Sequence, residues 1–363
     1  MVTFRSARPI VSLAVVGFSG LSACSSSQDV TDPVAGGGLP NPISTVITDW
    51  APLPGGREWG ATAGIDIGPD GHIWAYDRCG AIVLLDPGCE NRSVDPIFKI
   101  NRDTGEIMTS FGAGEFVVPH GLHVDGNENV WVTDWQGNEG GTKGHQVIKF
   151  SPEGEVLLRL GQAGVPGDGP GQLNEPNDVI TAPNGDIYVA DGHSGQYGGY
   201  PEDKTGRIVR YDSEGNFIME WGVIGEDPGD FRSPHALAWD SQGRLFVADR
   251  GNHRIQIFDQ DGNHIDSYYQ FGRVSGLFIT ADDTLYAIDS ESDPERHPDW
   301  RRGVRIGNVN EDRVTAFIPP HETGDFYGAA GEGIALDADG NIYVAEGPNS
   351  REVAGGGITK YTP

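Results

Sequence analysis

Residue types that bind metal ions occupy matched positions in a pattern that recurs six times along the chain. The pattern is a fourteen-residue interval, and its second, fourth and sixth copies begin with His120, His235 and Glu332. Two neutral imidazoles and a carboxylate suit Zn²⁺ or another first-row divalent ion and leave open positions for water or substrate. Either histidine alone could instead be bonded to water or backbone in a polar channel. The predicted metal site therefore depends on the position that all three residues share.

Two arginines hold a second set of matched positions. Arg78 and Arg250 each follow the acidic residue that closes the interval, in its first and fourth copies. Two guanidinium groups above a metal ion would form a receptor for a carboxylate, although each could instead pair with its neighbouring aspartate. Trp135 holds the same position in the second copy. Together with the loop residues Tyr197 and Tyr200, it could line a pocket for substrate.

The interval itself predicts a β-hairpin. In each copy, two short apolar runs flank a turn rich in Gly, Asp and Asn, as in HGLHVDGNENVWVTD and NDVITAPNGDIYVAD. Third runs such as HQVIKF and GRIVRY and fourth runs such as EVLLRL follow most copies, and no helical periodicity interrupts them. Four strands in each of six units predict an all-β fold, a six-bladed β-propeller.

A propeller would bring the matched residues together. The innermost strand of each blade lines the central channel, so the first residues of the six intervals would form a ring at one mouth. His120, His235 and Glu332 would then converge from blades about 120° apart. Because each hairpin returns the chain to the same mouth, Arg78 and Arg250 would lie beside this ring. The remaining ring positions carry small or uncharged residues: Ala63, Asn177 and Ser275.

The two ends of the chain suggest a propeller domain over residues 43–363. The last unit ends at ITKY without a fourth strand, and the strand-like segment 44–50 precedes the first complete hairpin. We expect this segment to complete the last blade. Residues 1–42 would then lie outside the propeller.

The first 23 residues have the features of an export signal. Arg5 and Arg8 precede an apolar stretch that is too short to span a bilayer. The sequence Leu21-Ser22-Ala23-Cys24 resembles a bacterial lipobox, which predicts a lipid on Cys24; the alternative is an ordinary signal peptide with an incidental cysteine. Residues 24–42 are polar and rich in Pro and Gly, as in a flexible tether. We therefore expect an exported bacterial lipoprotein, anchored to a membrane on the periplasmic or cell-surface side.

The charge and the cysteine content of the chain limit its possible binding partners and the cellular compartment in which it works. Without residues 1–23 the chain has 23 basic and 53 acidic residues, a formal charge of −30, which argues against nucleic-acid binding. Cys79 and Cys89 are then the two remaining cysteines, and an export signal favours a disulfide between them over two free thiols. We expect a monomer.

Residues 60–363 resemble the NHL-repeat family and, within it, the peptidyl-α-hydroxyglycine α-amidating lyases. The segments FVVPHGLHVDGNENVWVTD, FRSPHALAWDSQGRLFVADRGNHRIQIF and WAYDRCG carry the resemblance. It implies a zinc ion held by three histidines, a structural calcium ion, and two arginines and a tyrosine in the active site. The implied reaction cleaves the C–N bond of a terminal α-hydroxyglycine and yields a peptide amide and glyoxylate.

By this resemblance, His120 and His235 match two zinc ligands, and Arg78 and Arg250 match the active-site arginines. The positions whose backbone carbonyls would bind calcium are Ile65 and Leu122.

The chain departs from the family at three positions. Glu332 replaces the third zinc histidine, and Gly333 replaces an acidic calcium ligand. His193 stands where the family has a tyrosine, and only Tyr197 or Tyr200 in the same loop could replace that tyrosine.

Two functions remain open at this stage. In a lyase, the substrate hydroxyl would be polarised by the metal, Arg78 or Arg250 would hold the carboxylate, and His193, Tyr197 or Tyr200 would take the proton. The substrate could be a peptide, or another small hydroxy acid or carbinolamide. The alternative is a non-catalytic, lipid-anchored propeller that binds a protein or a glycan.

Replacing Cys24 by serine should release the protein from the membrane fraction, because the lipid is expected on the cysteine sulfur, which the variant lacks. Fractionation of cells that produce the wild-type chain and the Cys24→Ser variant would measure this. A variant that still sediments with membranes would refute the lipid anchor.

Overall fold

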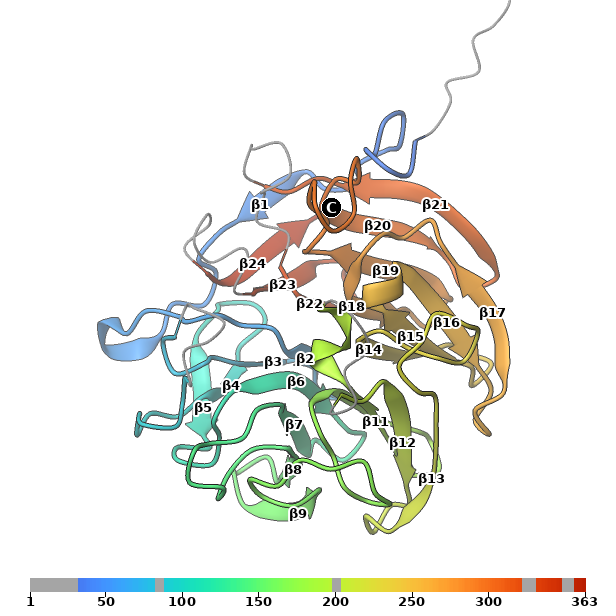
Figure 1. The fold of residues 1–363 in the computed structure, drawn as a ribbon. Helices are drawn as coiled ribbons and strands as arrows, with labels where there is room; N and C mark the ends of the chain where they lie inside the picture. The colour runs from blue at the N-terminus through green and yellow to red at the C-terminus, as the bar shows by residue number, and fades with distance from the viewer. Residues whose placement is uncertain (1–31, 82–87, 198–203, 322–330, 348–355) are drawn as a thin grey trace, which may run out of the picture. The chain divides into compact units, whose positions relative to one another are not determined.

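The computed structural model describes residues 32–81, 88–197, 204–321, 331–347 and 356–363 (Figure 1). Over these residues the chain forms six antiparallel sheets of four strands each. Each innermost strand contacts the innermost strand of the next sheet, and the first contacts the last. The sheets are therefore the blades of a closed six-bladed β-propeller, which confirms the fold predicted from the repeated hairpins.

Blades 1 to 3 follow the short 3-10 turn η1 (Pro54–Gly56). Blade 1 consists of β2 (Ile65–Ile67), β3 (Ile73–Tyr76), β4 (Ile97–Ile100) and β5 (Ile107–Phe111). Blade 2 consists of β6 (Pro119–Val124), β7 (Val130–Asp134), β8 (Gln146–Phe150) and β9 (Val156–Leu160). Blade 3 consists of β10 (Pro176–Thr181), β11 (Ile187–Asp191), β12 (Arg207–Tyr211) and β13 (Phe217–Trp221), with the turn η2 (His193–Gln196) after β11.

Blades 4 to 6 complete the ring. Blade 4 consists of β14 (Pro234–Trp239), β15 (Leu245–Asp249), β16 (Arg254–Phe258) and β17 (His264–Tyr268), with the turn η3 (Arg250–Asn252) after β15. Blade 5 consists of β18 (Val274–Ile279), β19 (Thr284–Asp289), β20 (Gly303–Asn308) and β21 (Glu311–Ile318). Blade 6 consists of β22 (Gly333–Leu336), β23 (Ile342–Glu346), β24 (Gly357–Thr362) and β1 (Thr45–Ile47).

The ring closes through the pairing of the first strand with the last. β1 lies antiparallel to β24, with Thr45 opposite Thr362 and Ile47 opposite Lys360 (Figure 1). The expected completion of the last blade by the segment around residues 44–50 is thus confirmed.

Burial changes from the inside of each blade to the outside. All five residues of β7 are buried because neighbouring blades cover both faces of this strand, whereas four of the five residues of the outer strand β9 are partly or fully exposed. The second strands accordingly read as continuous apolar runs. Large rings such as Trp74 and Trp131 are fully or almost fully buried between blades and fix the spacing of the ring.

The described part of the expected tether contacts blade 5. The Arg305 Nε donates a hydrogen bond of 2.8 Å to the carbonyl of Pro33, and the backbone N–H of Phe317 donates one of 3.0 Å to the carbonyl of Pro40. Residues 33–40 are therefore held on the propeller. Cys24 lies outside the described residues. No helix in the described part of the chain is long and apolar enough to cross a bilayer.

A disulfide joins Cys79 to Cys89, as expected from the cysteine count. Because Cys79 follows Arg78 directly, the bond restrains the loop that carries this arginine. The backbone N–H of Cys89 also donates a hydrogen bond of 2.9 Å to the carbonyl of Val117 in the segment that leads into blade 2.

A Cys79→Ser, Cys89→Ser double variant should lose about 2–3 kcal/mol of stability, because the closed loop restricts the unfolded chain. Guanidinium unfolding of the oxidised wild type and of the double variant would measure the difference. Reducing agent should lower the midpoint of the wild type and leave that of the variant unchanged. Equal midpoints for the two oxidised proteins would contradict the prediction.

Candidate functional site

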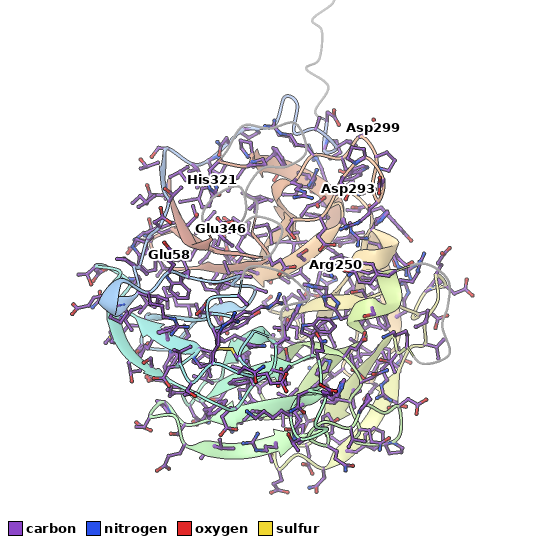
Figure 2. The ribbon with its side chains drawn as sticks, turned by 60° about the vertical axis from the view of Figure 1, so that its left-hand side comes forward. Glu58, Arg250, Asp293, Asp299, His321 and Glu346 are labelled. Carbon is purple, nitrogen blue, oxygen red and sulfur yellow. A yellow bond between two sulfur atoms is a disulfide. The ribbon has the colours of Figure 1, made fainter. Side chains whose placement is uncertain are left out.

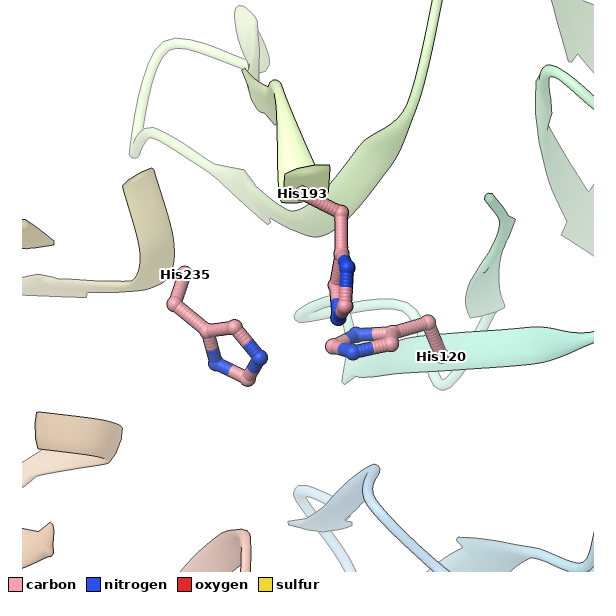
Figure 3. A group of neighbouring side chains, drawn as sticks. All are labelled: His120, His193 and His235. Carbon is pink, nitrogen blue, oxygen red and sulfur yellow. The ribbon is translucent and has the colours of Figure 1, made fainter. Parts of the chain in front are cut away.

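Three buried histidines meet at the axis of the propeller. His120 is the second residue of β6 in blade 2, His235 holds the same position in β14 of blade 4, and His193 opens the turn η2 after β11. One ring nitrogen of each lies within 4.8 Å of the others, and Figure 3 shows the three rings approaching one another from separate elements. Such an arrangement is typical of a divalent metal site with three protein ligands.

Hydrogen bonds fix the orientation of two of these rings. The Nδ1 atoms of His120 and His235 lie 2.9 and 2.7 Å from the backbone carbonyls of Asn177 and Ser275. A carbonyl only accepts, so the proton must sit on Nδ1 and the lone pair on Nε2. Both Nε2 atoms are buried and have no hydrogen-bond partner among the described residues. A bound cation would satisfy these two acceptors.

The three imidazoles are uncharged near neutral pH. Burial lowers the pKa of all three well below the ordinary value for histidine, and nearby guanidinium groups lower each pKa further: Arg78 and Arg250 act on His120 and His193, and Arg250 acts on His235. Neutral imidazole is the form that binds metal ions, so the cluster needs no loss of protons before it binds.

His193 is held by an aromatic stack and by a glycine. The indole of Trp135 stacks on its imidazole with ring centroids 4.4 Å apart and an interplanar angle of 25°. The preceding Gly192 has a φ of 139°, and a Cβ at this position would collide with the carbonyl of Thr205. Trp135 is buried and therefore supports the cluster, in place of the open pocket wall that the sequence suggested.

The glutamate expected as the third ligand occupies another position. Glu332 lies in the predicted ring, and with His120 and His235 it lines a cavity of about 50 Å³. Its carboxylate is not part of the histidine group, and its Oε1 lies 3.5 Å from the Nη1 of Arg250. His193 takes the third place because the turn η2 crosses toward the ring. The sequence signal for this third ligand is the histidine directly after Asp191-Gly192. From the sequence alone, this histidine is a candidate base.

The two arginines face the same cluster with different partners. Arg250, which is labelled in Figure 2, is fully buried. Its Nη1 lies 3.4 Å from the Ser275 hydroxyl and 3.6 Å from a carboxylate oxygen of Glu291. Arg78 is also buried; its Nε donates to the carbonyl of Pro119 at 3.1 Å, and neither Nη has a hydrogen-bond partner among the described residues. Both terminal nitrogens of Arg78 thus lack a partner among the described residues, whereas on Arg250 only the Nε does.

The alternative salt bridges to the neighbouring aspartates do not form. Asp77 pairs with Arg57, and Asp249 accepts from Arg254 at 2.8 Å. Sequence reasoning also missed Glu291, which follows the fifth interval by two residues. Burial alone would raise the pKa of its carboxyl, but the guanidinium groups of Arg250, Arg273 and Arg296 lower it to about 2.

The acidic residues that close the hairpins position the segments that enter the ring. The Asp134 carboxylate accepts hydrogen bonds of 2.9 and 2.7 Å from the backbone N–H groups of Val117 and Val118, and His120 follows two residues later. Asp191 accepts from the N–H of Glu175 at 2.7 Å in the same way. In blades 2 and 3 the repeated acidic position thus holds the approach to the innermost strand.

Of the loop tyrosines, Tyr197 is 44% exposed and its ring centre lies 6.4 Å from that of His193. It borders the cluster from the solvent side. Tyr200 lies outside the described residues.

The implied calcium site does not fit the residues present. Ile65 and Leu122 line the channel as expected. At Gly333, however, any Cβ would collide with the carbonyl of Ala63, so no acidic side chain fits there without a shift. The one acidic neighbour in the matching position, Asp178, already accepts from the N–H groups of Val179 and Leu237, both at 2.9 Å. We assign no role to calcium.

Comparisons with known proteins agree with this fold. The family model described as NHL repeat matches residues 231–258. A gluconolactonase from Xanthomonas campestris shares the fold, with a TM-score of 0.58 and 15% identity over 89% of this chain and 94% of that one. The chain is an NHL-repeat β-propeller.

Among such propellers, the chain resembles the amidating lyases. It is 32% identical over 294 residues to peptidyl-glycine α-amidating monooxygenase B of Xenopus laevis, a match that covers 76% of this chain and 30% of the relative. It is 34% identical over 281 residues to peptidyl-α-hydroxyglycine α-amidating lyase 1 of Drosophila melanogaster, over 69% of this chain and 46% of the relative. The chain thus spans less than half the length of either protein.

Gly347 leaves the space that the Glu332 side chain fills. A Cβ at this glycine would lie 2.6 Å from Cγ and 2.7 Å from Cδ of Glu332. Gly347→Ala should therefore displace the carboxylate and cost about 1–3 kcal/mol in the free energy of unfolding. Gly126→Ala is a matched control, because no atom lies within 4 Å of its added methyl group. Denaturant unfolding of both variants tests this, and equal stability of the two would refute the tight fit.

Proposed function

We propose that this chain is a metal-dependent carbon–nitrogen lyase that acts on an α-hydroxyglycine or related carbinolamide at the channel mouth. The observation that carries the proposal is the group of three neutral, buried imidazoles next to a buried guanidinium with unused donors. The similarity to the amidating lyases supports the reaction class. Because the chain spans only part of those relatives, the activity is our inference from the site.

His120, His193 and His235 would hold the metal ion, and zinc is the ion that suits three neutral imidazoles best. When bound, the ion supplies a Lewis acid that polarises an oxygen of the substrate. The two unpartnered Nε2 atoms and their fixed Nδ1 hydrogen bonds favour this assignment. Three protein ligands leave room for a substrate oxygen.

Arg78 would bind the substrate carboxylate. Its two free Nη groups match the two oxygens of a carboxylate, and a buried charge-assisted pair is stronger than an exposed one. Arg250 is the poorer receptor, because Glu291 lies beside its guanidinium in addition to Glu332, which acts on both arginines. The carboxylate and the adjacent hydroxyl of an α-hydroxyglycine would then lie between Arg78 and the histidines. A small hydroxy acid offers the same two groups.

We also propose export and membrane attachment through a lipid on Cys24. The disulfide between Cys79 and Cys89 supports an oxidising compartment outside the cytoplasm. The acidic surface is compatible with a soluble domain on a lipid tether.

Purified protein should contain one zinc ion per chain and release glyoxylate from a peptide that ends in α-hydroxyglycine. His120→Ala and His193→Ala should each weaken zinc binding by more than the roughly 10–100-fold that the loss of an outer partner costs. His264→Ala, on β17 and outside the cluster, should behave as the wild type. Elemental analysis and a colorimetric glyoxylate assay measure both properties.

Each outcome decides between the two functions. Activity that is lost with a chelator and restored by zinc supports the lyase. Bound metal without glyoxylate release, or no metal at all, would favour the non-catalytic propeller that binds a protein or glycan.

A further inference from the structure

We propose that Glu332 is the proton-transfer group of this site: it accepts the hydroxyl proton of the substrate and delivers it to the leaving nitrogen. This inference rests on the proposed lyase function and assigns a residue that the metal cluster leaves unused.

Within the described residues, one carboxylate oxygen of Glu332 has no hydrogen-bond partner. The residue is 4% exposed, and its Oε1 lies 3.5 Å from Arg250, whereas its Oε2 is buried without a hydrogen-bond partner among the described residues. An unsatisfied buried acceptor costs stability and calls for a partner. Because Glu332 is one of the residues that line the axial cavity with His120 and His235, a substrate O–H at the cluster would supply that partner.

The arrangement of the blades frees Glu332 from metal binding. Blades 3 and 6 are opposite each other in the ring of six, as the contacts between successive innermost strands show. Blade 3 supplies the third imidazole, His193, and blade 6 supplies the carboxylate. His193 thus has the ligand role that the sequence predicted for Glu332, and Glu332 has the proton-transfer role that the sequence suggested for His193.

The surroundings suit a carboxylate that both takes and returns a proton. Burial raises the pKa of Glu332 above its ordinary value; Arg78 and Arg250 oppose this shift, and Glu291 adds to it. A carboxyl group with a raised pKa is a stronger base than an ordinary one and can return the proton as an acid.

The tyrosines nearby are poorer candidates. The full burial of Tyr76 and the partial burial of Tyr197 raise the pKa values of both phenols, which keep their protons at neutral pH. His193 belongs to the imidazole cluster and contacts Arg250 at 3.4 Å. Among these groups, Glu332 is the one that is ready to accept a proton.

The proton balance of the reaction needs only one such group. Glu332 removes the proton of the hydroxyl, the electrons of that O–H bond form the C=O of glyoxylate, and the C–N bond breaks. The nitrogen takes the electron pair of the broken bond and the same proton from Glu332, which yields the amide. No oxidant, reductant or water is consumed.

Glu332→Gln tests this role, because the amide keeps the shape of the side chain and cannot accept the proton. We expect wild-type zinc content, a KM within about threefold, and a kcat lower by roughly 10²–10⁴-fold. Glu291→Gln removes the other carboxylate at Arg250 and should lower kcat much less. In Glu332→Ala, added formate should restore part of the lost kcat, because a small carboxylate fits the space that the side chain leaves.

Each other result overturns the role. Loss of zinc from Glu332→Gln would show that Glu332 is a metal ligand. Equal losses of kcat in Glu332→Gln and Glu291→Gln would show that Glu332 only balances the charge of Arg250. Glyoxylate release by Glu332→Gln at the wild-type rate would refute proton transfer and leave the lyase function intact. Absence of release by the wild type would refute the lyase function and this role together.

Discussion

The site depends on a hydrogen bond that two of the three axial histidines each make to the blade that follows their own. His120 in blade 2 bonds to the carbonyl of Asn177 in blade 3, and His235 in blade 4 bonds to that of Ser275 in blade 5. These hydrogen bonds fix the tautomer of both imidazoles and the orientation of each Nε2. The chemistry of the axis is therefore set by the spacing between blades, which the buried aromatic rings and the closed circle of sheets maintain.

The charges around the axis follow from the same enclosure. Water cannot screen groups buried this deeply, so each charge must find an opposite charge or a ligand. Arg250 has Glu332 and Glu291 beside it, whereas the Nη groups of Arg78 have no hydrogen-bond partner among the described residues. In the proposed lyase, this difference between two residues in matched positions would draw an anionic group to the side of blade 1.

The sequence predicts the fold and those site residues that lie at the innermost strands, because both follow from a fixed interval. An interval of fourteen residues determines which residue begins each innermost strand, so His120, His235 and Glu332 could be assigned to one ring from spacing alone. His193 and Glu291 lie in loops after the interval, and their positions depend on the unusual conformation of Gly192, on stacking against Trp135 and on a cluster of arginines. Contacts between residues far apart in the sequence decide such details, and no local pattern records them.

The pairing of β1 with β24 has a consequence for biogenesis. Thr45 and Thr362 are partners, so the circle cannot close until almost the whole chain has left the ribosome and, if the chain is exported, has crossed the membrane. The entropy lost in joining such distant ends grows only slowly with chain length. The pairing of β1 with β24 nevertheless comes last, because it needs the C-terminal strand. Until it succeeds, the edge of β24 offers unpaired backbone groups to any neighbouring strand. A chain cut short before residue 357 would lack β24 entirely, and its β1 would have no strand to pair with.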